Sequence, residues 1–151
     1  MILVEDVQKA LEALATASRT RSKAKILAIT GSVGKTSTKD MLRTVLEKQG
    51  RTHASVASYN NHWGVPLTLA RMPVETEYGI FEIGTNHPGE IAPLARLVRP
   101  DVVLITMVSA AHLESFGSVE AIAEEKAAIM DGLNSNGTAV LNADISTEPV
   151  L

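Results

Sequence analysis

The sequence predicts an α/β fold, a mostly parallel sheet flanked by helices, of the kind found in P-loop NTPases. Segments with a strand pattern alternate with helical segments along most of the chain, which is typical of a sheet covered by helices on both faces. The expected strands are continuous apolar runs, as buried parallel strands are. A short stretch with two glycines, ITGSVGKTS at residues 29–37, joins the first of these strands to a helix. A chain of 151 residues is long enough for one such domain.

The first expected element is an amphipathic helix at residues 5–19, where apolar residues recur with helical spacing. The elements after it are strand 26–30, helix 35–48, strand 52–56, a short helix with Pro66 in its first turn, strand 78–83, helix 90–98, strand 102–107, helix 118–131 and strand 138–141. We divide the chain into a leading helix and linker, residues 1–22, and the N-terminal portion of a nucleotide-binding domain, residues 23–151. No helical pattern follows the last strand, so we expect the domain to be truncated.

The composition argues against several classes of function. The 14 Lys and Arg residues and 17 Asp and Glu residues give a net charge of -3, so the chain lacks the basic field with which proteins bind nucleic acid. Cysteine is absent, which excludes thiolate metal sites and favours a reducing compartment, the cytoplasm. The sequence has neither a long apolar run nor a signal peptide, and we expect no membrane insertion.

The stretch after the first strand has the composition of a phosphate-binding loop. Small residues allow successive backbone N–H groups to surround an anion at the N-terminus of a helix, where the helix dipole is positive. Lys35 would reach the outer phosphates, and the Thr36 hydroxyl would bind the Mg²⁺ that bridges two phosphates. Ile29 occupies the place of the first glycine of the standard P-loop, so this loop is a shorter variant. The expected phosphate-binding residues are Gly31, Ser32, Val33, Gly34, Lys35, Thr36 and Ser37.

Two further residues at the carboxyl ends of the strands could bind metal. Glu82 lies within the apolar run YGIFEIG, where a carboxylate is costly unless a cation or metal pairs with it. The alternative for Glu82 is a solvent-facing position on an edge strand. His112 follows the fourth strand in a loop of small residues and could be a metal ligand, although a single histidine is more often a surface residue.

Lys126 is expected to point into the protein. In the helix at residues 118–131 it lies four residues after Ile122 and three before Ile129, on the apolar face. A buried lysine tends to lose its proton and can become a nucleophile or a site of chemical modification. The alternative is a side chain whose stem is buried while its ammonium group reaches water.

Taken together, these motifs resemble those of the Mur ligases, the ATP-dependent amide-bond-forming enzymes of peptidoglycan synthesis. The resemblance rests on ITGSVGKTSTKDML, NNHWGVPLTLAR, FEIGTNHPGEI, AAHLESFGS, EEKAAI and LNAD, which cover nearly the whole chain. It accounts for the short loop, because the family's loop has the form TGxxGKT. Asn60, Asn61 and the TNHPGEI segment point to the branch that adds D-alanyl-D-alanine to UDP-N-acetylmuramoyl-tripeptide through an acyl phosphate.

The resemblance implies how ATP and one Mg²⁺ would be bound. Residues 31–37 would bind the ATP phosphates, with Lys35 on the outer ones. Thr36 and Glu82 would bind the Mg²⁺ that accompanies the nucleotide.

The resemblance also implies a second Mg²⁺ site. His112 would bind this metal, and Lys126 would be carbamylated, so that the new carboxylate supports the same metal. Lys35, His112 and Lys126 would be the catalytic residues. Asn60 and Asn61 match a segment near the transferring phosphate and the muramoyl substrate.

Members of this family have one domain before the central domain and one after it, and the resemblance covers only part of the central domain. We therefore expect the isolated chain to be inactive. The resemblance also implies that the complete enzyme is a monomer. One alternative is a stand-alone nucleotide-binding module. Another is a different ligase of the superfamily, of the folylpolyglutamate or cyanophycin type, against which Asn60, Asn61 and TNHPGEI argue.

Overall fold

The computed structural model describes residues 3–111, 113–145, 147 and 150. Its centre is a parallel sheet in the order β2-β3-β1-β4-β5. The strands are β1 (Lys25–Thr30), β2 (Thr52–Ala54), β3 (Tyr78–Glu82), β4 (Val102–Ile105) and β5 (Thr138–Leu141). The predicted α/β fold with a parallel sheet is therefore confirmed. The central strand, β1, pairs with β3 on one side and β4 on the other.

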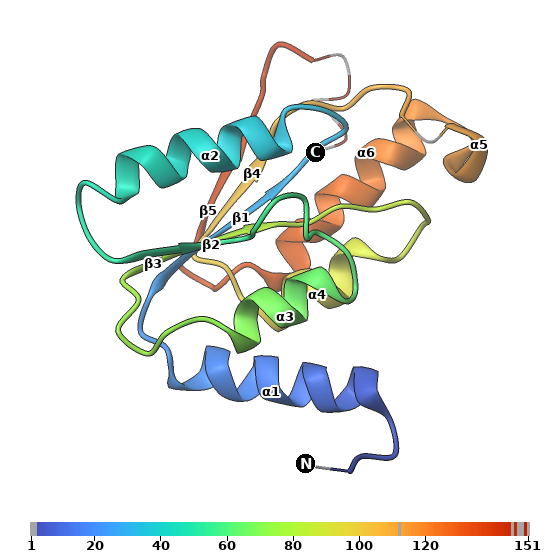
Figure 1. The fold of residues 1–151 in the computed structure, drawn as a ribbon. Helices are drawn as coiled ribbons and strands as arrows, with labels where there is room; N and C mark the ends of the chain where they lie inside the picture. The colour runs from blue at the N-terminus through green and yellow to red at the C-terminus, as the bar shows by residue number, and fades with distance from the viewer. Residues whose placement is uncertain (1–2, 112, 146, 148–149, 151) are drawn as a thin grey trace.

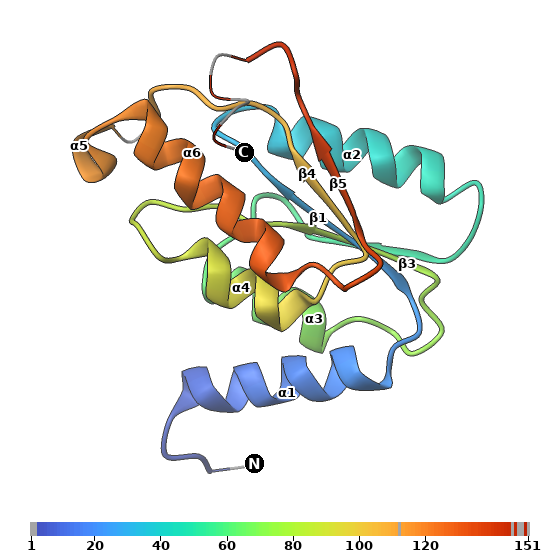
Figure 2. The ribbon, with the colours of Figure 1, turned by 180° about the vertical axis from the view of Figure 1, so that it is seen from behind.

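Helices cover both faces of the sheet (Figures 1 and 2). One face carries α2 (Lys35–Leu46), and the other carries α3 (Gly64–Ala70), α4 (Ile91–Val98) and α6 (Val119–Ala127). The N-terminal helix, α1 (Val7–Arg21), lies outside this layer against α3 and α4. No helix in the described part of the chain is both long and apolar enough to cross a membrane.

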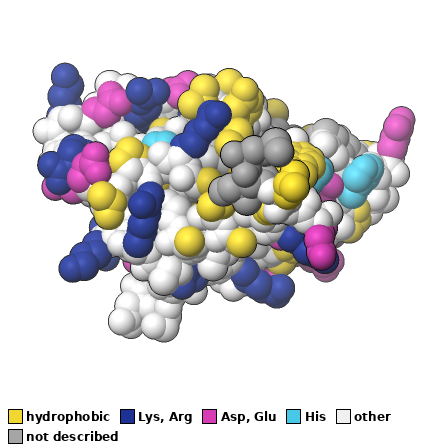
Figure 3. Space-filling model, turned by 60° about the horizontal axis from the view of Figure 1, so that its bottom comes forward, with side chains coloured by type: hydrophobic (Ala, Val, Ile, Leu, Met, Phe, Trp, Pro, Cys, Tyr) yellow, Lys and Arg dark blue, Asp and Glu magenta, His cyan; other side chains and the backbone are white. Residues whose placement is uncertain are grey.

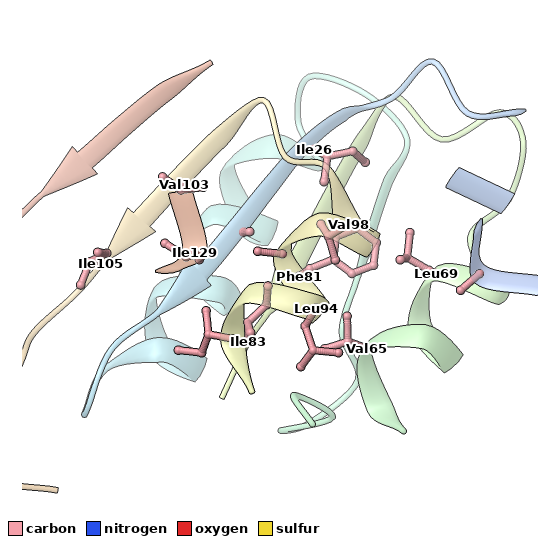
Figure 4. Packing of buried hydrophobic residues seen from close by; sticks show 14 of the residues in the cluster. Ile26, Val65, Leu69, Phe81, Ile83, Leu94, Val98, Val103, Ile105 and Ile129 are labelled. Carbon is pink, nitrogen blue, oxygen red and sulfur yellow. The ribbon is translucent and has the colours of Figure 1, made fainter. Parts of the chain in front are cut away.

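The main hydrophobic core lies between the sheet and the α3, α4 and α6 layer (Figure 4). Phe81, Ile83 and Val103 point to this side and belong to the same buried cluster as Leu69 and Leu94, with Val103 close to Ile129. Side chains alternate between the faces of a strand, so neighbouring residues point to the α2 side. The face of the sheet that carries the main core is also the face on which α1 forms an additional outer layer.

Arg19 anchors α1 to this layer. Its guanidinium donates to the backbone oxygens of Val98 (Nε, 2.7 Å) and Arg99 (Nη2, 2.8 Å), at the C-terminus of α4. Only 9% of Arg19 is exposed, and carbonyl oxygens at a helix C-terminus favour a cation. On the face shown in Figure 3, described side chains of both charges are mixed with hydrophobic ones.

Several element boundaries differ from those predicted. The helix expected at residues 118–131 ends as an α-helix at Ala127 and continues as the 3-10 turn η1 (Ala128–Gly132). There the chain passes so close to α4 that a Cβ on Gly132 would overlap the carbonyl group of Ala95. A short helix, α5 (Leu113–Phe116), was not predicted.

The strand expected at residues 102–107 ends at Ile105. The residues that follow turn toward the loop after β1, where Thr106 N–H donates to Thr30 O (3.0 Å) and Ser32 N–H donates to Met107 O (2.7 Å). The strand expected at residues 52–56 ends at Ala54, and the N-terminal helix runs two residues further than expected, to Arg21.

Candidate functional site

The loop between β1 and α2 is held in a conformation that its two glycines permit. Gly31 has φ of 149° and Gly34 has φ of 85°, values that residues with a Cβ rarely adopt. A Cβ on Gly31 would overlap the hydroxyl oxygen of Thr106. That hydroxyl donates to Val33 O (2.7 Å). Thr106, the residue that follows β4, therefore restrains the conformation of the loop.

Ser32 ties the same loop to the segment after β4. Its hydroxyl donates to Ser109 O (3.1 Å) and accepts from Ser109 N–H (3.0 Å). Sequence analysis did not identify Thr106 or Ser109 as part of the site. The signal that could have found them is their position just after a strand, because the carboxyl ends of parallel strands meet at one edge.

Lys35 is the first residue of α2 and lies over the loop. Its ammonium group donates to Gly31 O (2.6 Å) and to Ser32 O (3.4 Å). Burial lowers the pKa of Lys35, and the carboxylate of Glu82 opposes that effect. A cation is thus held at the positive end of a helix, an arrangement that favours a bound anion.

Glu82 is fully buried at the end of β3. One carboxylate oxygen, Oε2, accepts from the Thr36 hydroxyl (2.9 Å), and the other, Oε1, accepts from Asn60 Nδ2 (2.8 Å). β3 lies between β2 and β1, so the alternative of a solvent-facing edge-strand glutamate is wrong. The backbone N–H of Glu82 donates to Ser55 Oγ (3.2 Å), which sequence analysis did not identify.

The two neighbouring asparagines have different local roles. Asn60 contacts Glu82 through its side chain, and its backbone oxygen accepts from Gly84 N–H (2.8 Å). The side-chain oxygen of Asn61 accepts from the N–H groups of Trp63 (3.1 Å) and Gly64 (2.9 Å). Asn61 therefore stabilises the start of α3, as side-chain oxygens do at helix N-termini. A role for Asn61 in ligand binding stays a prediction.

Lys39, one turn after Lys35 on α2, is a buried cation that sequence analysis missed. It is 2% exposed, and its ammonium group donates to Ala57 O (2.7 Å). Ala57 has φ of 48°, a conformation that is unfavourable for residues other than glycine. Lys39 therefore holds the loop between β2 and α3, which also carries Asn60.

Two adjoining cavities meet at these residues. The smaller, of about 350 Å³, is formed by residues 32–37, the predicted phosphate-binding residues other than Gly31, together with Ser58, Asn60 and Glu82. The larger, of about 570 Å³, is lined by Glu12, Lys35, Asn60, Asn61, His62, Gly84, Thr85, Asn86, His87, Glu90, Pro93 and Leu94. Lys35 and Asn60 line both cavities, so ligands in the two would meet there.

The loop at residues 84–90 forms one wall of the larger cavity. Glu90 folds back on this loop, and its Oε2 accepts from the N–H groups of Asn86 (2.7 Å) and His87 (3.2 Å) and from Thr85 Oγ1 (3.2 Å). Burial raises the pKa of Glu90, but these hydrogen bonds outweigh it and leave the pKa below its ordinary value. Glu90 thus stays ionised, and its carboxylate holds the loop folded back toward the start of α4.

Lys126 is buried, as predicted from its place on the apolar face of its helix, and only 3% of the residue is exposed. Burial lowers its pKa to about 8, with the charge of Lys35 acting in the same direction and Glu125 opposing. His112, the residue predicted to bind the second metal together with Lys126, lies outside the described residues. Among the residues that are described, no group of three or more His, Asp or Glu side chains could by itself hold a metal ion.

Comparison with known proteins gives a consistent result. The Mur ligase middle domain matches residues 29–150. The chain is 46% identical over 143 residues to the UDP-N-acetylmuramoyl-tripeptide--D-alanyl-D-alanine ligase of Rickettsia prowazekii, a match that covers 95% of this chain and 32% of that protein. It thus spans about a third of the length of such relatives.

Solved structures agree. The chain is similar to MurF from Acinetobacter baumannii, with a TM-score of 0.93 and 33% identity over 99% of this chain and 33% of the other. It is also similar to MurF ligase from Thermotoga maritima in complex with ADP, with a TM-score of 0.88 and 32% identity over 98% of this chain and 34% of the other.

Proposed function

The chain belongs to the Mur ligase family, as part of the middle domain, and we propose that it serves an ATP-dependent ligase that joins D-alanyl-D-alanine to UDP-N-acetylmuramoyl-tripeptide. The sequence identity of 46% to a relative whose name describes this activity supports the choice of branch. Because the chain covers about a third of that relative, we further propose that these residues alone do not complete the reaction. The reaction would take place in the cytoplasm, which the lack of cysteine favours.

The observation that carries this proposal is the contact between Thr36 and Glu82. The Thr36 hydroxyl in the first turn of α2 and the buried Glu82 carboxylate at the end of β3 lie 2.9 Å apart. Both are oxygen ligands of the kind that Mg²⁺ prefers. The residues therefore fit a Mg²⁺ that keeps phosphate and water as its other ligands. When bound, this metal would neutralise charge on the phosphates.

The phosphate-binding loop would hold the nucleotide itself. Gly31 and Gly34, with their positive φ, turn the chain into the start of α2, whose first N–H groups would face the phosphates, and the Lys35 ammonium group lies beside this turn. These groups would bind the phosphates and stabilise negative charge as the outer phosphate is transferred. The ADP-bound relative from Thermotoga maritima supports this assignment.

Lys126 would be the site of carbamylation. With a pKa of about 8, roughly a quarter of its amines are neutral at pH 7.5, against roughly one in a thousand for an ordinary lysine. The neutral amine can add to carbon dioxide, forming a carbamate and releasing one proton. The product is a buried carboxylate beside the phosphate-binding loop, where it and His112 would hold a second Mg²⁺.

The larger cavity would receive the muramoyl peptide. There the terminal carboxylate of the tripeptide would attack the outer phosphorus of ATP, which breaks the bond to the bridging oxygen and releases ADP. The amine of D-alanyl-D-alanine would then displace phosphate from the acyl phosphate and lose a proton as the amide forms. Lys35 and Asn60, which line both cavities, would orient the reacting groups. Their contribution is positioning and charge neutralisation.

The test is an assay of phosphate release by the complete protein that contains these residues. We expect rapid release with ATP, Mg²⁺, the muramoyl tripeptide and D-alanyl-D-alanine, and a loss of at least about a hundredfold in the Lys35→Ala variant. We expect omission of either peptide to prevent turnover. Release that is equally fast without both peptides would show that the site belongs to a nucleotide-binding module rather than a ligase.

A further inference from the structure

Glu125, the residue before Lys126 on α6, is a buried acid that the proposed reaction does not use. It is 8% exposed. Its carboxylate accepts two backbone N–H groups from a different part of the chain, with Oε2 2.6 Å from Gly89 N and Oε1 2.9 Å from Ile91 N. Hydrogen bonds from N–H groups to an ionised carboxylate are stronger than those between neutral groups, and two of them fix its orientation.

These two N–H groups lie at the start of α4. The N-cap residue of this helix, Glu90, forms no capping hydrogen bond with its side chain, because its carboxylate points back to Asn86 and His87. Glu125 therefore supplies the missing cap from a separate helix, where the helix dipole favours a negative charge. Gly89 has φ of 86°, which lets the backbone turn its N–H toward Glu125.

The position of this contact connects two parts of the candidate site. The loop at residues 84–90 lines the larger cavity, whereas Glu125 itself does not line it. Glu125 is adjacent to Lys126 on a helix that packs on α4. The contact therefore fixes the distance between the cavity wall and the helix that carries Lys126.

We propose that Glu125 is a positioning residue that fastens the loop at residues 84–90 to α6. A substrate in the larger cavity would thereby be held in a fixed position relative to the phosphate-binding site. This proposal rests on the proposed function, in which that substrate is the muramoyl peptide. Glu125 acts only through the loop, so its loss weakens binding of the muramoyl substrate and leaves nucleotide binding intact.

The experiment compares Glu125→Ala and Glu125→Gln with Glu124→Ala in the complete protein. Glu124 is the exposed neighbour on the same helix, so its variant has the same change of charge without the contact. Glutamine has the size of glutamate but carries an NH₂ group, a donor, in place of one acceptor oxygen. Because Gly89 and Ile91 donate to different oxygens of Glu125, one of the two N–H groups loses its acceptor. Amide hydrogen exchange across residues 84–91 and KM values for the muramoyl tripeptide and ATP are measured for each protein.

We expect exchange at Gly89 and Ile91 to rise by about tenfold or more in Glu125→Ala. We expect KM for the muramoyl tripeptide to rise by a similar factor, with KM for ATP within about twofold of the unmodified protein. Glu125→Gln should lie between the two, and Glu124→Ala should match the unmodified protein.

Three outcomes overturn the proposal. If exchange at Gly89 and Ile91 stays unchanged in both Glu125 variants, the contact does not hold the loop. If exchange rises while both KM values stay level, Glu125 is only a helix cap. If instead the unmodified protein does not use the muramoyl tripeptide at all, the proposed function fails, and the proposal about Glu125, which depends on that substrate, is overturned with it.

Discussion

At the scale of single residues, Lys126 combines burial with a lowered pKa. In the unfolded chain its pKa is near the ordinary 10.5, and in the folded chain it is about 8. Well below pH 8 both states are protonated, and the folded state carries the full cost of a buried charge. Between about pH 8 and 10.5 the unfolded state binds more protons, so stability rises with pH and the cost disappears.

Lys126→Met is therefore expected to stabilise the protein at neutral pH. We expect a gain of about 1–3 kcal/mol in the free energy of unfolding at pH 7 and less than about 1 kcal/mol at pH 10. Urea unfolding in buffers free of carbon dioxide measures both values. Lys48→Met, at an exposed lysine, is the matched control. Equal gains at the two pH values would contradict the assigned pKa.

Glu82 provides a second test at this scale. If Glu82 binds the nucleotide's Mg²⁺, then Glu82→Gln should remove most of the effect of Mg²⁺ on ATP affinity, a loss of about 10- to 100-fold. Affinity without Mg²⁺ should change little. Calorimetric titration with and without Mg²⁺ measures both, with exposed Glu75→Gln as control. A full Mg²⁺ effect in Glu82→Gln would exclude this residue from the metal site.

At the scale of elements, the loop after β1 depends on Gly31 for two reasons. Its φ is positive, and a Cβ there would overlap Thr106. Gly117 also has a positive φ, of 79°, but a Cβ there would meet no atom within 4 Å. Comparison of the two glycines therefore shows how much the overlap with Thr106, together with the more extreme φ of Gly31, adds to the backbone strain of a positive φ.

We expect Gly117→Ala to cost about 1 kcal/mol of stability, from backbone strain alone. Gly31→Ala should cost about 2–4 kcal/mol, because Thr106 must also move. Urea unfolding of both variants measures this difference. Similar losses in the two variants would mean that Thr106 does not confine the loop.

The sequence predicted most elements because their signals are local. The apolar run of β1, the glycine loop and the helix that begins at Lys35 are adjacent in the chain, and their order alone indicates a phosphate-binding βα unit. Glu82 and Lys126 were found for a similar reason, since each places a charge within a local apolar pattern. Local pattern also fixed their burial, which the structure confirms.

Contacts between distant segments could not be predicted in this way. Glu125 has no local signal, because its partners lie 36 and 34 residues away. Ser109 and Thr106 join the site only because β4 lies beside β1, and strand order does not follow from periodicity. The end of α6 at Ala127 depends on the approach of the following turn to α4. The role of His112 stays a prediction.

At the scale of the whole molecule, the arrangement of layers places both cavities at the carboxyl ends of the strands. β1 is the central strand, and the chain leaves it toward α2 on one face, while α3, α4 and α6 cover the other. The N-terminal helix adds Glu12 to the larger cavity, and Gln8 Nε2 donates to His62 O (2.7 Å). The outer helix therefore forms part of the wall of the larger cavity.

The central claim is that the phosphate-binding loop serves amide-bond formation through an acyl phosphate. It is tested most directly by labelling the terminal carboxylate of the muramoyl tripeptide with ¹⁸O and analysing the phosphate that the complete protein releases. If the carboxylate oxygen attacks phosphorus and leaves with it, as we propose, one labelled oxygen should appear in phosphate for each amide bond formed. Unlabelled phosphate would mean that water attacks ATP, and would contradict the account.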